Sequence, residues 1–267
     1  MFWVVLMWIA CAPRMNTAEP ESLVEQFQVR VVGEFGPLQL QGDAPTTLAL
    51  ASHVTLNLRL RWEPTRQFRD GSVGRLVEFD EAEMVSHQED KTTVVPLELA
   101  GRAVELRTFP NGEVLDISWI SRVSGIGRSM DVFDVVFSVL SPSPPTLNEG
   151  ESVKRRIMLP YRDENRIRWD HSVNAVWTHG GDGKHGDADV TRIEYLGPWK
   201  TAGMTRGEPP RTKYDATGNA EGVILYDKQS REMAQHEFAW TRQVQVIGSQ
   251  GVLTQEQSFT GTVERLP

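Results

Sequence analysis

The clearest pattern along the chain is a strict alternation of apolar and polar residues in its N-terminal half. In Val54–Glu63, every second residue from Val54 to Trp62 is apolar, and the residues between them are polar. Successive side chains of a strand point to opposite faces, so this alternation predicts an antiparallel strand with one face in water. Phe27–Val31 shows the same alternation, and Arg75–Phe79 predicts a further strand.

Hairpins are predicted on both sides of the middle of the chain. Val104–Trp119 contains Asn111-Gly112, which supplies the positive backbone dihedrals of a tight turn between two strands. Further strands are predicted at Lys154–Tyr161, Arg168–Thr178, Val190–Tyr195, Gly222–Asp227, Met233–Val246 and Val252–Glu264, the last three forming a meander. Two segments are predicted outside the sheet: Asp80–Lys91 as a short helix or exposed loop, and Thr201–Pro210 as a loop.

One segment in the middle of the chain has helical periodicity. Apolar residues recur at helical spacing at Met130, Phe133, Val136, Phe137 and Leu140. The prolines of Ser141–Pro145 end this pattern, because proline lacks the amide hydrogen that a helix needs. A buried strand is the competing interpretation, since several of the intervening residues are β-branched valines. The polar opposite face favours a short helix over Met130–Leu140.

These elements predict a mainly β protein with one large curved antiparallel sheet or half-open barrel, built from hairpins. We expect the central helix to pack on the apolar face of that sheet. A chain of 267 residues can form one large all-β domain. The expected domain is therefore 21–267, with halves 21–129 and 130–267 on either side of the helix.

Composition limits the classes of partner. Charged residues make up 24% of the chain and hydrophobic residues 39%, which is typical of a globular protein. The formal net charge is −8, with acidic residues spread along the chain. Because binding to phosphates needs a basic face, this charge disfavours a nucleic-acid partner.

The N-terminus differs from the rest of the chain. Met1–Ala10 is wholly apolar, and the only cysteine, Cys11, follows it directly. Ten residues are too few to cross a bilayer as a helix, but they suit the apolar core of a secretory signal. Ile9-Ala10-Cys11 resembles the lipobox of bacterial lipoproteins, although Trp8 stands where that motif usually has leucine.

The lipobox resemblance implies export, lipidation of Cys11 and a membrane anchor. Ala12 implies the outer membrane, facing the periplasm, because it is not the aspartate that retains such lipoproteins at the inner membrane. Residues 1–20 would then be a signal segment followed by a short tether. The alternative is a structural cysteine buried in the domain, which is the usual fate of a lone thiol.

One short segment of the chain contains a cluster of potential metal ligands. The segment His179–Asp189 contains His179, Asp182, His185, Asp187 and Asp189. Their spacing matches no calcium loop, and the two histidines do not have the helical spacing of zinc hydrolases. A solvated hairpin loop is favoured, with no metal or other cofactor, and a metal-dependent enzyme using this loop is the less favoured alternative.

No nucleophile stands in a recognisable catalytic setting, because the chain lacks a Gly-x-Ser-x-Gly motif, so we expect no enzyme activity. Several tryptophans fall on predicted strands, where they either pack in the core or line a groove for a lipid or another apolar ligand. These groove candidates are Trp62, Trp119, Trp169, Trp177 and Trp240.

The pattern over Met130–Leu266 resembles that of uncharacterised exported lipoproteins of Gram-negative, myxobacteria-like bacteria. The shared features are the helix with its proline exit, the Gly-Glu-Ser step at 150–152, a glycine-rich strand at Gly218–Asp227 and a final hairpin. The general form is also similar to periplasmic lipoprotein carriers and lipid-binding lipoproteins. The resemblance implies an envelope-anchored, non-enzymatic binding or structural module, with a carrier of lipid or another apolar ligand as the alternative.

Overall fold

The computed structural model describes residues 24–41, 46–48, 52–88, 91–97, 99–109, 114–120, 145–162, 168–204, 212–230, 232–248 and 251–267. Every regular element within these ranges is a β-strand, so the predicted mainly β class is confirmed. The central helix predicted at Met130–Leu140 falls outside the described residues, as do Cys11 and the expected signal segment 1–20.

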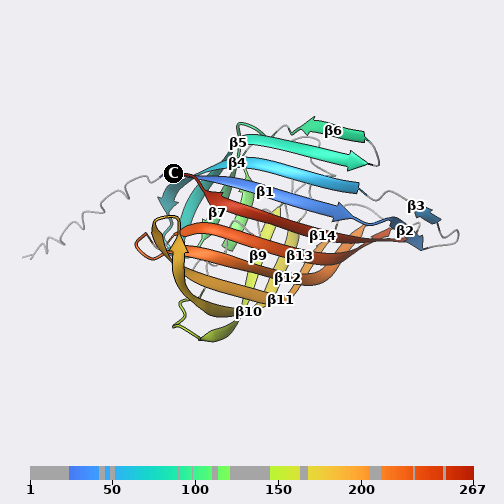
Figure 1. The fold of residues 1–267 in the computed structure, drawn as a ribbon. Coiled ribbons are helices and arrows are strands. Elements are labelled where there is room, and N and C mark those ends of the chain that lie inside the picture. The colour runs from blue at the N-terminus through green and yellow to red at the C-terminus, as the bar shows by residue number, and fades with distance from the viewer. Residues whose placement is uncertain are drawn as a thin grey trace, which may run out of the picture.

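Within the described residues, fourteen strands form a single sheet (Figure 1). Their bounds are β1 (Glu25–Phe35), β2 (Leu38–Gln41), β3 (Thr46–Leu48), β4 (Ser52–Gln67), β5 (Val73–Gln88), β6 (Lys91–Pro96), β7 (Arg102–Thr108), β8 (Val114–Trp119), β9 (Ser152–Arg162), β10 (Arg168–His185), β11 (Ala188–Met204), β12 (Lys213–Asp227), β13 (Met233–Gly248) and β14 (Gly251–Arg265).

The sheet curves back on itself into a nearly closed, barrel-like form. The strand order is β1-β4-β5-β7-β8-β9-β10-β11-β12-β13-β14, and β14 pairs with β1 from Phe27↔Arg265 to Phe35↔Gln257. Among the described residues, all neighbours in this circuit are antiparallel except β8 and β9, which meet in parallel at the single pair Ile117↔Tyr161. The circuit is therefore continuous everywhere but weakest between β8 and β9.

Alternation along the strands separates an apolar inner face from a polar outer face. Leu56, Leu58 and Leu60 of β4 are fully buried in one apolar cluster that spans both halves of the sheet. The arginines between them lie on the outer face, where Arg59 and Arg61 form ion pairs with Glu81 and Glu78 of β5. The alternating sequence pattern of this segment is thus the direct cause of its placement.

Inward-facing aromatic rings cover glycines on neighbouring strands. Tyr195 of β11 lies directly opposite Gly222 of β12, and a Cβ added at Gly222 would meet the Tyr195 ring at 2.6 Å. Phe238 of β13 lies opposite Gly261 of β14 in the same way, at 2.7 Å. Cross-strand pairs of this kind bury the aromatic ring where the glycine leaves room, and glycines within strands allow a sheet to bend. The same arrangement recurs at Phe259 and Gly33, where an added Cβ would lie 3.2 Å from the Phe259 ring.

Most predicted strands are confirmed, including the Val104–Trp119 hairpin (β7 and β8) and the C-terminal meander (β12 to β14). Two predictions are wrong. Asp80–Lys91 was expected to be a helix or loop, but β5 continues to Gln88, with Ala82 and Met84 packed against the core. Its acidic residues form the solvated face of a strand. Thr201–Pro210 was expected to be a loop, but β11 extends to Met204; residues 205–210 lie outside the described residues.

We predict that Gly222→Ala lowers the free energy of unfolding by about 1–3 kcal/mol, because the new methyl group would overlap the Tyr195 ring. Chemical denaturation measures this change. The matched control is Gly183→Ala in β10, where nothing lies within 4 Å of the added Cβ. A Gly222→Ala variant as stable as the Gly183→Ala variant would contradict the account of the aromatic–glycine pairs.

Candidate functional site

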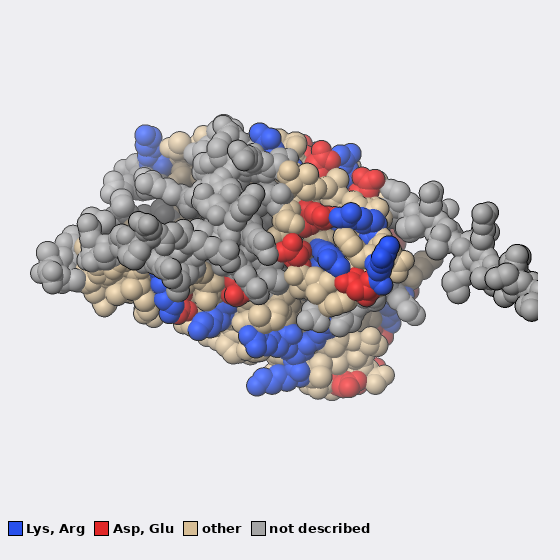
Figure 2. Space-filling view, turned by 180° about the vertical axis from the view of Figure 1, so that it is seen from behind, with Lys and Arg blue, Asp and Glu red and all other residues tan. Residues whose placement is uncertain are grey.

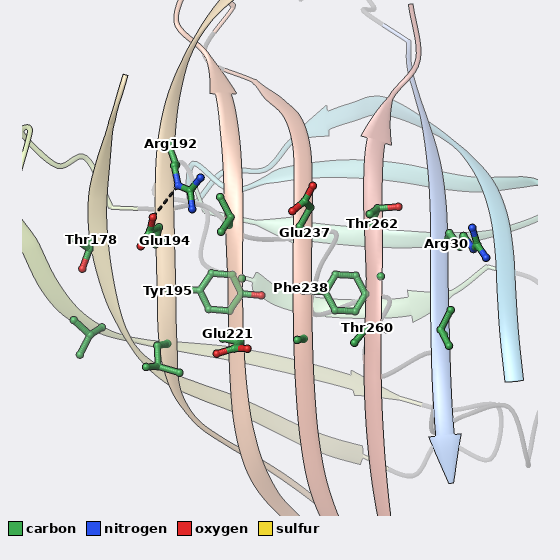
Figure 3. A pocket seen from close by; sticks show the side chains of 17 residues that line it. Arg30, Thr178, Arg192, Glu194, Tyr195, Glu221, Glu237, Phe238, Thr260 and Thr262 are labelled. Carbon is green, nitrogen blue, oxygen red and sulfur yellow. Dashed lines mark hydrogen bonds and ion pairs between the residues drawn. The ribbon is translucent and has the colours of Figure 1, made fainter. Parts of the chain in front are cut away.

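An open groove of about 930 Å³ crosses the outer face of β10 to β14 and β1. Two rows of outward-facing residues form its sides. One row runs through Thr178, Glu194, Val223, Glu237, Thr262 and Arg30, and the other through Val176, Leu196, Glu221, Ala239, Thr260 and Val32. Figure 3 shows the labelled members of these rows on either side of the Tyr195 and Phe238 rings. We call this surface the outer groove.

The floor of the outer groove is formed by the strand positions between the two rows. In cross-strand register these are Tyr195, Gly222, Phe238 and Gly261, and all four contribute to the lining. The Tyr195 and Phe238 side chains themselves are buried on the inner face.

The sides of the outer groove combine apolar and charged groups. Val176 is 46% exposed and Leu196 is 59% exposed, which is unusual for large apolar side chains. Glu194 accepts a hydrogen bond of 2.7 Å from Arg192. By contrast, Glu221 and Glu237 form no ion pair with any described residue, so the centre of the groove is acidic. This mixture suits a ligand with both apolar and basic groups.

A second open groove, of about 910 Å³, lies further along the same outer face. Thr217 and Gly218 of β12 contribute to its lining, together with Thr241 of β13. At its far side are Glu34, His53 and His87, which belong to three neighbouring strands.

The inner face holds a buried hydrogen-bonded network that the sequence did not reveal. Trp240 Nε1 donates to the Tyr195 hydroxyl at 3.0 Å, and that hydroxyl lies 3.0 Å from His236 Nε2. The hydroxyl thus accepts from Trp240, and the direction of its hydrogen bond with His236 Nε2 follows from the imidazole tautomer. Burial raises the pKa of Tyr195 above its ordinary value, so the phenol stays neutral. The network satisfies polar atoms inside an apolar core.

A second buried histidine lies further along the inner face. His171 Nδ1 is 2.7 Å from the Thr201 hydroxyl, and both residues are buried. Burial, together with the nearby Arg242 guanidinium, lowers the pKa of His171 to about 3. Arg242 in turn donates to Gln257 and lies over the rings of Trp199 and Phe259. His171 is therefore neutral at physiological pH, and its surroundings are closed to solvent.

The His179–Asp189 segment is an ordered β-hairpin that continues β10 and β11 to a two-residue turn at Gly186-Asp187. Gly186 has a positive φ of 57°, as such turns require. Asp182 pairs with Lys228 and accepts a hydrogen bond from Thr191, which hold its pKa below the usual range.

The five candidate ligands of this hairpin do not converge. His179 Nε2 is 3.9 Å from Asp182, whereas Asp189 pairs with Lys184, and Asp187 and His185 are exposed near the turn. No three His, Cys, Asp or Glu side chains among the described residues are gathered closely enough to hold a metal ion as they stand.

Three of the five tryptophans proposed for an apolar groove lie in the core. Trp62, Trp177 and Trp240 are all buried in the single apolar cluster, and Trp177 stacks on Tyr195 with ring centroids 4.9 Å apart. The side chains of Trp119 and Trp169 fall outside the described part of the chain. Trp62 likewise contacts the Phe27 ring and Trp240 contacts the Trp199 ring, so these tryptophans pack among other aromatic side chains of the core.

Comparison with protein-family models and with curated proteins finds no match for this chain. Nothing carried over from relatives therefore assigns a role to these residues. No helix in the described part of the chain has the length and hydropathy needed to cross a membrane. On the face seen in Figure 2, basic and acidic side chains lie next to one another among uncharged residues.

A carboxyl at the start of β1, that of Glu25, has a strongly raised pKa. The pKa of Glu25 is raised from 4.5 to about 7, mainly by burial. The hydrogen bond and charge of Glu232 also raise this pKa, and they outweigh the lowering by Arg265 and Arg75. Arg265 Nη2 lies 3.4 Å from Glu25 Oε1, and Arg265 Nη1 lies 2.6 Å from Glu232 Oε2, so one guanidinium forms ion pairs with two carboxyl groups. These residues join the ends of β1 and β14 to the beginning of β13.

We predict that this carboxyl makes the protein more stable as the pH falls from 8 to 5. Because the folded state binds the Glu25 proton more tightly than the unfolded chain does, its contribution is present below the unfolded pKa and lost as the pH rises through about 7. Glu25→Gln should remove about 1–2 kcal/mol of this pH dependence in urea unfolding.

The control is Glu256→Gln, an exposed carboxyl with no ion pair among the described residues, which should keep the wild-type pH dependence. If Glu25→Gln and wild type show the same change in unfolding free energy between pH 8 and 5, the assignment to Glu25 is wrong.

Proposed function

We propose that the protein is an envelope-anchored lipoprotein that acts as a non-enzymatic binding scaffold through its outer face. In this proposal Cys11 carries the lipid, residues 1–20 supply the signal and tether, and the β-domain faces the periplasm from the outer membrane. The partner is an apolar ligand or another envelope protein rather than a nucleic acid.

The observation that carries the proposal is the contrast between the two faces of the sheet. Inward-facing aromatic and aliphatic residues from β1, β4, β5 and β7 to β14 share one buried cluster. The outer groove instead exposes Val176 and Leu196 beside the carboxylates of Glu221 and Glu237. A binding surface on the outer face requires no opening of the core.

A carrier of lipid or another apolar ligand is the alternative, and it requires an open cavity lined by tryptophan. The burial of Trp62, Trp177 and Trp240 within the packed cluster disfavours this alternative. A metal-dependent enzyme using the 179–189 segment is disfavoured by its geometry, because Asp182 and Asp189 are already paired with lysines.

The most strongly buried histidines are placed to support the core. The two most strongly buried histidines, His171 and His236, are held by Thr201 and Tyr195 on the closed inner face. A general acid or base must reach the proton it transfers, and these rings face the core.

We predict that the full-length chain produced in a Gram-negative host is recovered in the outer-membrane fraction with a lipid-modified N-terminus. Cys11→Ala should remove the modification and release the protein from that fraction, because the thiol is the attachment point. Membrane fractionation with mass spectrometry of the N-terminal peptide measures both effects.

The matched control is Trp8→Leu, which restores the leucine usual in the lipobox and should leave the protein in the membrane fraction. Equal membrane recovery of the wild-type and Cys11→Ala chains, with no lipid on either, would refute lipid anchoring through Cys11.

A further inference from the structure

Two histidines face each other across neighbouring strands at the edge of the second groove. His53 of β4 lies directly opposite His87 of β5 in the cross-strand register. Their ring centroids are 5.4 Å apart, and their planes are nearly perpendicular at 81°. His53 is exposed and His87 is half-buried, so metal ions in solution can reach both rings.

The separation of these rings is close to that of two imidazoles on one metal ion. A zinc–nitrogen bond of about 2.0–2.1 Å and tetrahedral coordination place two ligating imidazole centres about 5 Å apart. The centroid separation of 5.4 Å is therefore compatible with a shared metal ion when one nitrogen of each ring turns toward it. Cross-strand neighbours on a β-sheet are also held rigidly, which reduces the entropy cost of bringing two ligands together.

One ring already has the hydrogen bond that commonly orients a metal-bound histidine. His87 Nδ1 lies 3.1 Å from the Thr92 hydroxyl on β6, the strand that flanks β5. When Nδ1 donates to Thr92, the remaining nitrogen, Nε2, is the one available to a metal ion.

A carboxylate stands next to the pair on the other side. Glu34 of β1 lies directly opposite His53, so Glu34, His53 and His87 are consecutive across three strands and line the same groove. Ser258 donates to Glu34 Oε2 at 3.4 Å, a weak contact that a metal ion could replace. Cross-strand neighbours have Cβ atoms about 5 Å apart, which is within the reach of a glutamate side chain.

We propose that His53, His87 and Glu34 form a binding site for a divalent transition-metal ion of the class that prefers imidazole, such as Zn²⁺. The three side chains do not converge as they stand, so binding requires both imidazoles to turn toward the ion and Glu34 to rotate. His53 and His87 then supply nitrogen ligands, Glu34 supplies an oxygen ligand, and solvent completes the coordination. This site is independent of the proposed anchoring and lies outside the 179–189 segment in which the sequence placed its candidate ligands.

The site differs from the 179–189 hairpin in the availability of its ligands. In that hairpin, Asp182 and Asp189 are paired with Lys228 and Lys184, and His185 and His179 lie apart from each other. At the second groove, His53 and His87 are not engaged by any acidic group in the described part of the chain.

The test is titration of the full chain with Zn²⁺ in competition with a chromophoric chelator, comparing wild type, His53→Gln, His87→Gln and Glu34→Gln. His185→Gln is the matched control, because it removes an exposed histidine elsewhere on the sheet. Circular dichroism checks that each variant is folded.

We expect wild type and His185→Gln to bind one Zn²⁺ equally well. His53→Gln and His87→Gln should each weaken binding by at least about tenfold, with a smaller loss for Glu34→Gln. Zn²⁺ affinity that is unchanged in both His53→Gln and His87→Gln, lost in His185→Gln or absent in wild type would overturn the site. A Glu34→Gln variant that binds like wild type would overturn the assignment of Glu34 as a ligand.

Discussion

The packing of inward-facing aromatic rings over glycines of adjacent strands is the interaction on which this structure depends. Tyr195 over Gly222 and Phe238 over Gly261 bury large apolar surfaces in a sheet that must bend strongly to let β14 pair with β1. Flat sheets do not close, and glycines within long strands supply the necessary curvature. The rings prevent these glycines from leaving gaps in the core.

The same interaction determines where function can reside. The aromatic rings on the inner face leave the Trp240–Tyr195–His236 network fully enclosed, so its polar groups serve the core. On the outer face, the grooves run between rows of outward-facing side chains. A ligand can therefore be bound on the outside without disturbing the inside.

The sequence predicted the sheet more successfully than it predicted the sites. Alternation over Val54–Glu63 is a local signal, and it located β4 and its two faces correctly. The Asp80–Gln88 part of β5 was missed because a run of acidic residues is typical of an exposed loop. Only the pairing of Glu81 with Arg59 on the neighbouring strand explains these residues as the outer face of a strand. His53 and His87 are far apart along the chain, and only the register of β4 and β5 brings them together. His179 and His185 were considered as metal ligands because they are close in sequence, but closeness in sequence does not ensure that side chains converge in space.

The most direct test of the account is native mass spectrometry of the full chain with Cys11→Ala, which removes the covalent lipid. If the core is filled and ligands bind on the outer face, the folded protein expressed in the envelope should be detected at the mass of the chain alone, without bound lipid. A stoichiometric lipid that dissociates on activation would contradict a filled core and make the protein an apolar-ligand carrier.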